Sequence, residues 1–112
     1  MWAKYKLGEM YRINDPETNA PAVRNPYYHK PGALPLPAAA LSKLMEAGVK
    51  VVACNLAITF WSGVTAQKMG LKHADVMKDW VDVVYPGIKI MPSGVFACNA
   101  AQSRGCHCLF AG

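Results

Sequence analysis

Apolar residues beyond residue 37 alternate between short unbroken runs and helical spacings, which predicts alternating strands and helices. Residues 49–53 are rich in β-branched side chains, and this run is typical of a strand buried on both faces in a parallel sheet. From Leu56 the apolar spacing becomes helical and continues to Gly70, a favourable C-cap. Asn55 is the expected N-cap of this helix. Cys54 therefore lies where the carboxyl end of a strand turns into a helix.

The same pattern predicts five further elements in this part of the chain. A helix is expected over residues 38–47, opened by Pro37, and another over residues 74–84. A strand is expected over 88–91, a helix with Ser93 as its N-cap follows, and a final short strand covers 106–111. Alternating units of this kind form parallel strands with right-handed crossovers. The predicted fold is α/β, an open, mostly parallel three-stranded sheet flanked by helices.

The first third of the chain has a different character. A short helix is expected from Met1 to Leu7, and residues 11–37 then hold six of the eight prolines. Residues 11–13 and 22–24 are candidates for a small hairpin around a turn at 15–19. A loop of this length is typical of a lid, an interface arm or a linker. The predicted organisation is an N-terminal helix and Pro-rich arm over 1–37 and an α/β domain over 38–112.

Composition and charge narrow the class of protein. Of the 112 residues, 53% are hydrophobic and 17% are charged, as in a globular domain. The net charge of +5 comes from scattered lysines and arginines, so nucleic acid is not an expected partner. The chain starts without an apolar signal segment, and polar residues interrupt its most apolar window, 51–66. A soluble, cytoplasmic protein without a membrane partner is therefore expected.

Cys54 is the candidate functional residue. A thiol at the carboxyl edge of a parallel sheet lies where ligands bind in open α/β folds. There it meets the free N–H groups and the positive end of a helix, which favour the thiolate. The alternative is a buried structural cysteine, the usual role of a thiol flanked by apolar residues. Nearby, Asn55, Ser93 and Gly94 are candidate ligand-binding residues, because backbone N–H groups at a helix N-terminus bind anions.

The other three cysteines have weaker signals, and reduced thiols are the expectation for all four. Cys98 falls within a predicted helix and is expected to pack in the core. Cys106 and Cys108 flank His107 on the predicted last strand, where alternate side chains face opposite ways. Zinc needs two further ligands, so no metal is predicted. Cys106 and Cys108 stay candidates for a resolving thiol. The sequence holds no phosphate-binding glycine loop and no assignable Ser-His-Asp triad, and no cofactor is expected.

Three features of residues 41–112 together resemble the DsrE/DsrF-like family of sulfur relay and sulfur metabolism. They are a helix followed by GVKVVACN, the PSGVFACNAAQSRG turn and helix, and a short C-terminal segment ending near CHCLFAG. The resemblance implies a DsrE/flavodoxin-like fold that lacks its first strands here. It also implies sulfur carriage on the cysteine after the strand, Cys54, and homo-oligomers, commonly trimers or hexamers. Exported relatives make a periplasmic location the alternative, should a longer precursor exist.

Two functions follow from these observations. One is a sulfur-relay or thiol-redox protein that accepts sulfane sulfur as a persulfide on Cys54 and passes it to a partner thiol. The other is a non-catalytic α/β binding or assembly module in which Cys54 is structural. The first predicts that Cys54 is the fastest of the four thiols to react. The second predicts four sluggish thiols in a stable oligomer.

Overall fold

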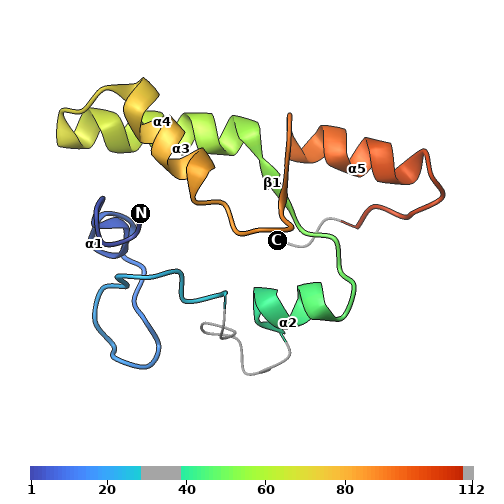
Figure 1. Cartoon of the computed structure of the whole chain (residues 1–112), viewed down its shortest axis with the longest axis horizontal. Helices are drawn as coiled ribbons and strands as arrows, with labels where there is room; N and C mark the ends of the chain where they lie inside the picture. The colour runs from blue at the N-terminus through green and yellow to red at the C-terminus, as the bar shows by residue number, and fades with distance from the viewer. Residues whose placement is uncertain (29–38, 110–112) are drawn as a thin grey trace. The chain divides into compact units, whose positions relative to one another are not determined.

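The structure, a computed structural model, describes residues 1–28 and 39–109. Within these residues the chain is a mixed α/β protein with five helices and a two-stranded parallel sheet (Figure 1). Its internal contacts divide it into two compact units, Met1–Lys50 and Val51–Gly112. The predicted division after residue 37 places the boundary earlier in the chain, and it stays a prediction.

The sheet of the second unit consists of β1 (Val52–Cys54) and β2 (Lys89–Met91). The strands pair in parallel, with Val52 opposite Lys89 and Cys54 opposite Met91. The parallel pairing confirms the prediction for these two segments. Both strands end at the same edge, and each runs directly into a turn or a helix N-terminus there.

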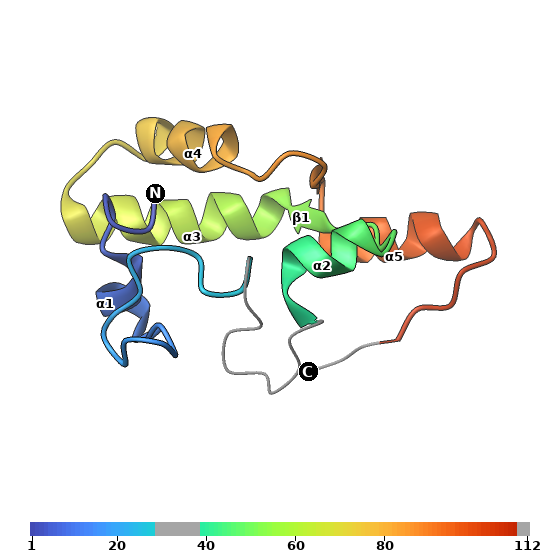
Figure 2. The ribbon, with the colours of Figure 1, turned by 60° about the horizontal axis from the view of Figure 1, so that its bottom comes forward.

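Helix α3 (Asn55–Met69) begins immediately after β1 and ends at Gly70, whose φ of 65° only glycine adopts at little cost. Helix α4 (His73–Asp82) lies alongside α3, as two views agree (Figures 1 and 2). The buried positions of the pair are mostly small or polar: Ser62, Thr65, Ala66 and Val76.

The helix predicted from Leu56 is confirmed, but not all of the apolar residues whose spacing predicted it are buried. Leu56 and Phe60 are 65% and 61% exposed, whereas Ser62 and Thr65 are fully buried. Small side chains let two helices approach closely, and the His73 ring lies 3.6 Å from where a Cβ on Gly63 would be. The packing therefore follows the small residues of α3, and several of its larger apolar side chains stay on the surface.

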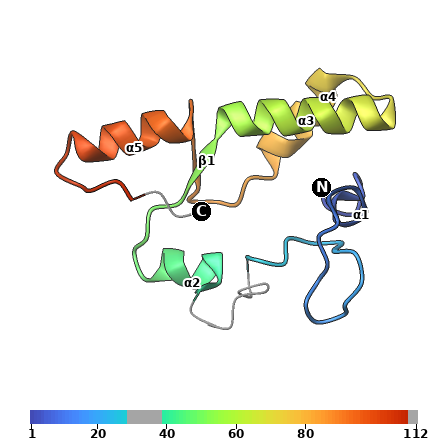
Figure 3. The same ribbon diagram turned by 180° about the vertical axis from the view of Figure 1, so that it is seen from behind.

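Helix α5 (Gly94–Gln102) follows β2 and has the predicted N-cap, since the Ser93 hydroxyl accepts a hydrogen bond from the Phe96 N–H at 3.0 Å. After the helix, Gly105 has a φ of 87°, and the chain turns back along α5 (Figure 3). Residues 106–109 form neither helix nor strand. The predicted last strand is therefore wrong for these residues, and its end at 110–111 lies outside the described residues.

The first unit contains two short helices, α1 (Leu7–Tyr11) and α2 (Leu41–Glu46). The helix predicted over Met1–Leu7 is displaced, because turns occupy residues 2–6 and helical hydrogen bonding starts at Leu7. The predicted start of the next helix at Pro37 lies outside the described residues. Each helix is too short to persist alone in water, so the surrounding loop must hold it in place.

A hairpin-like loop follows α1 and confirms the idea of a turn near residues 15–19. Asn14 and Pro21 form an isolated antiparallel bridge, and the Asp15 N–H donates to the Ala20 carbonyl at 2.9 Å. Arg24 binds the Asp15 and Glu17 carboxylates at 3.3 and 2.6 Å, and its hydrogen bond to Asp15 is the main reason its pKa is raised. The loop passes so close to α1 that a Cβ on Gly8 would lie 2.3 Å from the Ala22 nitrogen.

None of the helices in the described residues is both long and apolar enough to cross a lipid bilayer.

Candidate functional site: a thiol between two helix N-termini

Cys54 is the last residue of β1 and also the N-cap of α3. Its backbone is extended, with φ −84° and ψ 113°, and its Sγ accepts a hydrogen bond from the Ala57 N–H at 3.3 Å. The prediction that Asn55 caps this helix is wrong, because Asn55 is already the first helical residue. The cysteine sulfur occupies the place that a serine or aspartate oxygen usually takes at a helix start.

Backbone N–H groups of two helices lower the pKa of the Cys54 thiol. The Ala57 N–H has the largest effect, while partial burial acts in the opposite direction. The N–H groups of Gly94 and Leu56 also contribute to lowering the pKa. Ala57 and Leu56 belong to the first turn of α3, and Gly94 is the first residue of α5. Two helix N-termini thus stabilise the thiolate, and the half-buried sulfur still meets solvent.

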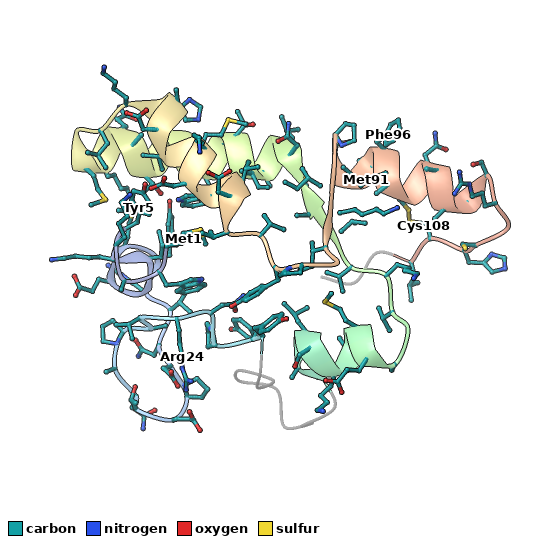
Figure 4. The ribbon with its side chains drawn as sticks, in the orientation of Figure 1. Met1, Tyr5, Arg24, Met91, Phe96 and Cys108 are labelled. Carbon is teal, nitrogen blue, oxygen red and sulfur yellow. A yellow bond between two sulfur atoms is a disulfide. The ribbon has the colours of Figure 1, made fainter. Side chains whose placement is uncertain are left out.

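The parallel register explains how α5 reaches this thiol. Cys54 pairs with Met91, so the two residues that follow Met91 emerge beside the start of α3. The Leu56 N–H donates to the Pro92 carbonyl at 3.3 Å and links the two turns. Figure 4 shows Met91 and Phe96 near the start of α5. The site is therefore a product of strand pairing between segments far apart in the sequence.

The three predicted ligand-binding residues lie at this same sheet edge. Gly94 presents its N–H to Cys54, and a Cβ added to it would meet nothing within 4 Å. Ser93 uses its hydroxyl as the cap of α5, so that oxygen is already engaged. Asn55 is adjacent to Cys54 and its carbonyl accepts from the Thr59 hydroxyl at 2.9 Å. Of these three residues, Gly94 is the one whose N–H lowers the pKa of the Cys54 thiol, and ligand binding by all three stays a prediction.

The expectation of four reduced thiols is wrong, because Cys98 and Cys108 form a disulfide with a Cα–Cα distance of 6.0 Å. Cys98 is half-buried on α5 and is not part of a packed core, since no residue of α5 is buried. The bond ties the chain after Gly105 to the middle of the helix (Figure 4). The segment after Gly105 is thus held by a disulfide to α5 and not by strand hydrogen bonds to the sheet.

The two predicted resolving thiols lie far from Cys54. Cys54 lies beside the N-terminus of α5. Cys106 lies at the C-terminal end of the same helix, where its N–H donates to the Ala101 carbonyl. The nine residues of α5 span about 13 Å. Cys108 is already bonded to Cys98, and Cys106 is a free, exposed thiol. The structure thus separates these cysteines from the candidate nucleophile.

No cluster of three or more histidine, cysteine or acidic side chains with the spacing of a metal site occurs within residues 1–28 and 39–109. Cys106, His107 and Cys108 are all exposed, and the disulfide engages one of the two thiols.

The sequence did not predict a contact between a serine and a histidine that the structure contains. The His73 Nε2 lies 3.0 Å from the Ser62 hydroxyl and 3.0 Å from the Thr59 carbonyl. Since a carbonyl only accepts, we assign the proton to Nε2, and Ser62 in turn donates to the Thr59 carbonyl at 3.1 Å. This nitrogen is not available as a base toward Ser62, and the pair instead joins α3 to α4. The sequence did not predict this contact, because Ser62 and His73 lie on different helices. The geometry of the turn between the helices, which the sequence pattern does not specify, decides whether the two residues meet.

Comparison of the chain with protein-family models, with curated proteins and with solved structures finds no match.

Proposed function

We propose that the protein is a sulfur-relay protein in which Cys54 accepts sulfane sulfur as a persulfide and passes it to a partner thiol. The observation that carries the proposal is the convergence of N–H groups from α3 and α5 on one half-buried sulfur. A nucleophilic thiol needs a stabilised thiolate and access to its substrate, and this thiol has both. No general base is required, which suits a sulfur that has no histidine or carboxylate contact among the residues that the structure describes.

The chemistry is a pair of thiol exchanges. The Cys54 thiolate attacks the outer sulfur of a donor persulfide, the donor's S–S bond breaks, and the donor leaves as a thiolate. Cys54 then holds the extra sulfur as a persulfide. A partner thiolate attacks that outer sulfur, a new S–S bond forms on the partner, and Cys54 returns as a thiolate. The N–H groups that favour the free thiolate also favour Cys54 as the leaving group.

The DsrE/flavodoxin-like fold belongs to the same proposal. A parallel strand pair with a cysteine at its carboxyl end is compatible with the family that residues 41–112 resemble. In this view, further strands extend the sheet beyond β1 and β2, and the chain forms a trimer or hexamer. Exposed apolar side chains on the first turns of α3 and α5 support assembly, since Leu56 and Val95 are 65% and 81% exposed.

The test is intact-mass spectrometry after exposure to a sulfane donor. The expected result is one adduct of about 32 Da, the mass of a sulfur atom, on the protein. Trypsin places Cys54 alone in the peptide 51–68, so the adduct is assigned by peptide mass. Cys54→Ser should lose the adduct, and Cys106→Ser is the matched control that should keep it. An adduct that persists without Cys54 contradicts the proposal.

The exposed apolar residues also favour a second function, a non-catalytic assembly module in which Cys54 only caps α3. The two functions differ in the reactivity of the thiol. Under the second, Cys54→Ser leaves every measurable activity unchanged, because a serine hydroxyl caps a helix at least as well. Comparing iodoacetamide rates of Cys54 and Cys106 in the native protein separates them. Relay chemistry requires Cys54 to be the faster near neutral pH.

A further inference from the structure

Three of the four cysteines lie in the middle of α5 or in the segment that follows this helix, away from Cys54. Cys98 is bonded to Cys108, and Cys106 is a free thiol two residues before Cys108. The N–H of Cys106 donates to the carbonyl of Ala101, which lies one turn beyond Cys98 on the same helix. A disulfide and a free thiol therefore share one short stretch of structure.

We propose that Cys98, Cys106 and Cys108 form a second thiol centre, a disulfide-exchange site in which Cys98 pairs alternately with Cys108 and Cys106. It goes beyond the relay at Cys54 and does not depend on it. The substrates that such a centre admits are small thiols and dithiols, because an attacking thiolate needs only an exposed sulfur.

Accessibility supports the exchange. Residues 101–109 are all exposed, so Cys106, Cys108 and the bond between Cys108 and Cys98 meet solvent. Gly105 supplies a pivot, because its φ of 87° is a conformation that glycine leaves and enters at little cost. Beyond it, residues 106–109 form neither helix nor strand, and a backbone hydrogen bond joins the Cys106 N–H to the Ala101 carbonyl. The Cα atoms of Cys106 and Cys108 lie at most about 7 Å apart, so a small shift exchanges their positions beside Cys98.

The exchange step involves no net oxidation. The Cys106 thiolate attacks the Cys98 Sγ, the Cys98–Cys106 bond forms, and the Cys98–Cys108 bond breaks. Cys108 leaves as a thiolate and takes up the proton that Cys106 lost. Attack on the Cys108 Sγ is disfavoured, because a bond between cysteines only two residues apart closes a small ring that departs from the preferred disulfide geometry. Cys98 is thus the shared partner of both thiols.

Peptide mapping tests the proposal, and the sequence is well suited to it. Trypsin cuts after Lys89 and after Arg104, so Cys98 lies in the peptide 90–104 and both other cysteines lie in 105–112. A stock of the native protein kept in acid is shifted to about pH 8, where thiolates form, without any added thiol. It is then quenched with acid, alkylated and digested. Fragmentation at His107 shows which cysteine of the linked peptide carries the alkyl group.

The expected result is a linked peptide alkylated on Cys106 at the start and a growing fraction alkylated on Cys108. The conversion should slow at about pH 6, where fewer thiolates exist. In Cys106→Ser, alkylation of Cys108 should be lost under the same conditions, because no neighbouring thiol remains to attack the Cys98–Cys108 bond. Cys54→Ser is the matched control and should exchange at the rate of the unchanged protein.

Three outcomes overturn the proposal. Alkylation only on Cys106 at all times means that no exchange occurs. Equal opening of the Cys98–Cys108 bond in Cys106→Ser means that Cys106 is not the attacking thiol. Loss of exchange in Cys54→Ser assigns the attack to Cys54. None of these outcomes bears on the persulfide at Cys54, which is read from a separate peptide.

Discussion

The cysteine beside the N-terminus of α5 and the cysteines toward its C-terminus are in opposite chemical situations. At its N-terminus, Cys54 is a half-buried single thiol whose thiolate is stabilised by backbone N–H groups. Toward its C-terminus, Cys98 and Cys108 are joined and the free thiol of Cys106 is exposed. The helix polarity is part of the reason, because its N-terminus favours a negative charge and its C-terminus does not. One helix can thus separate a nucleophile from a disulfide.

Removing the disulfide should give the largest change in stability. The bond joins residues ten apart in sequence, and closing a loop of that length contributes about 3 kcal/mol in the chain-entropy model. Cys98→Ser, which removes the partner shared by both C-terminal thiols, should lower the free energy of unfolding by up to that amount in a urea titration. Cys106→Ser is the matched control and should leave the urea midpoint unchanged. Equal stability of the two variants would contradict the disulfide.

Removing the cap of α5 should give a smaller change at its other end. The Ser93 hydroxyl accepts from the Phe96 N–H, and loss of such a cap costs about 1 kcal/mol. Ser93→Ala should lower the unfolding free energy by about that amount, and Ser93→Thr should restore most of it. The iodoacetamide rate of Cys54 should fall with the alanine variant, because α5 then frays beside the thiol. If the loss of the cap left this rate unchanged, α5 would not affect the reactivity of Cys54.

Removing one N–H donor should change the thiol with little change in stability. Gly94 is the first residue of α5, a favourable position for proline, and Ser93 before it is extended with φ −153° and ψ 165°. Gly94→Pro should therefore fold but raise the pKa of Cys54. Gly94→Ala keeps the N–H, fits the open space and should leave the pKa unchanged. The measurement is the iodoacetamide rate of Cys54 against pH in each variant.

The lowered pKa of Cys54 also fixes the sign of a pH effect on folding. The folded-state pKa lies below the ordinary thiol value because of the N–H groups, chiefly that of Ala57. The thiolate therefore stabilises the fold above the unfolded pKa, and this contribution is lost as the pH falls through the folded pKa. Cys54→Ser should flatten that part of the stability profile, measured by thermal unfolding across pH. A profile identical to that of the unchanged protein would contradict the lowered pKa.

The smallest effect is expected away from both ends of α5. Lys78 and Asp82 form an exposed ion pair one helical turn apart on α4, and its hydrogen bond raises the pKa of Lys78. Exposed pairs of this kind contribute little, because water and salt screen them. Lys78→Gln should not change the urea midpoint measurably or alter the reactivity of Cys54. A clear change in either would mean that α4 affects the thiol.

Local patterns predicted much of the fold. The helix ending at Gly70 and the serine cap at Ser93 depend on chemistry within a few residues, and both are present. The parallel pairing of two apolar segments followed from the alternation of strands and helices, and it is present as well. The predicted third strand failed at residues 106–109 because its apolar run carried no information about a cysteine partner on α5. Predicting that disulfide needed the distance between Cys98 and Cys108, which only the turn at Gly105 sets.

The candidate site was predicted in position but not in detail. The strand-to-helix junction at Cys54 followed from the change in apolar spacing. That the sulfur itself caps α3 was missed, because Asn55 is the better cap by residue type. The contribution of Gly94 depends on the register of β1 against β2, which a sequence pattern does not specify.

The pairing of β1 with β2 also has a consequence for folding kinetics. All of α3 and α4 lies between the two strands, so their contact closes a long loop and is expected to form late. The helix α5 and its cysteines are close in sequence and need no such closure. During refolding, the C-terminal thiols should therefore reach their native reactivity before Cys54 does. The alkylation rate of Cys54 during refolding then reports when the sheet is complete.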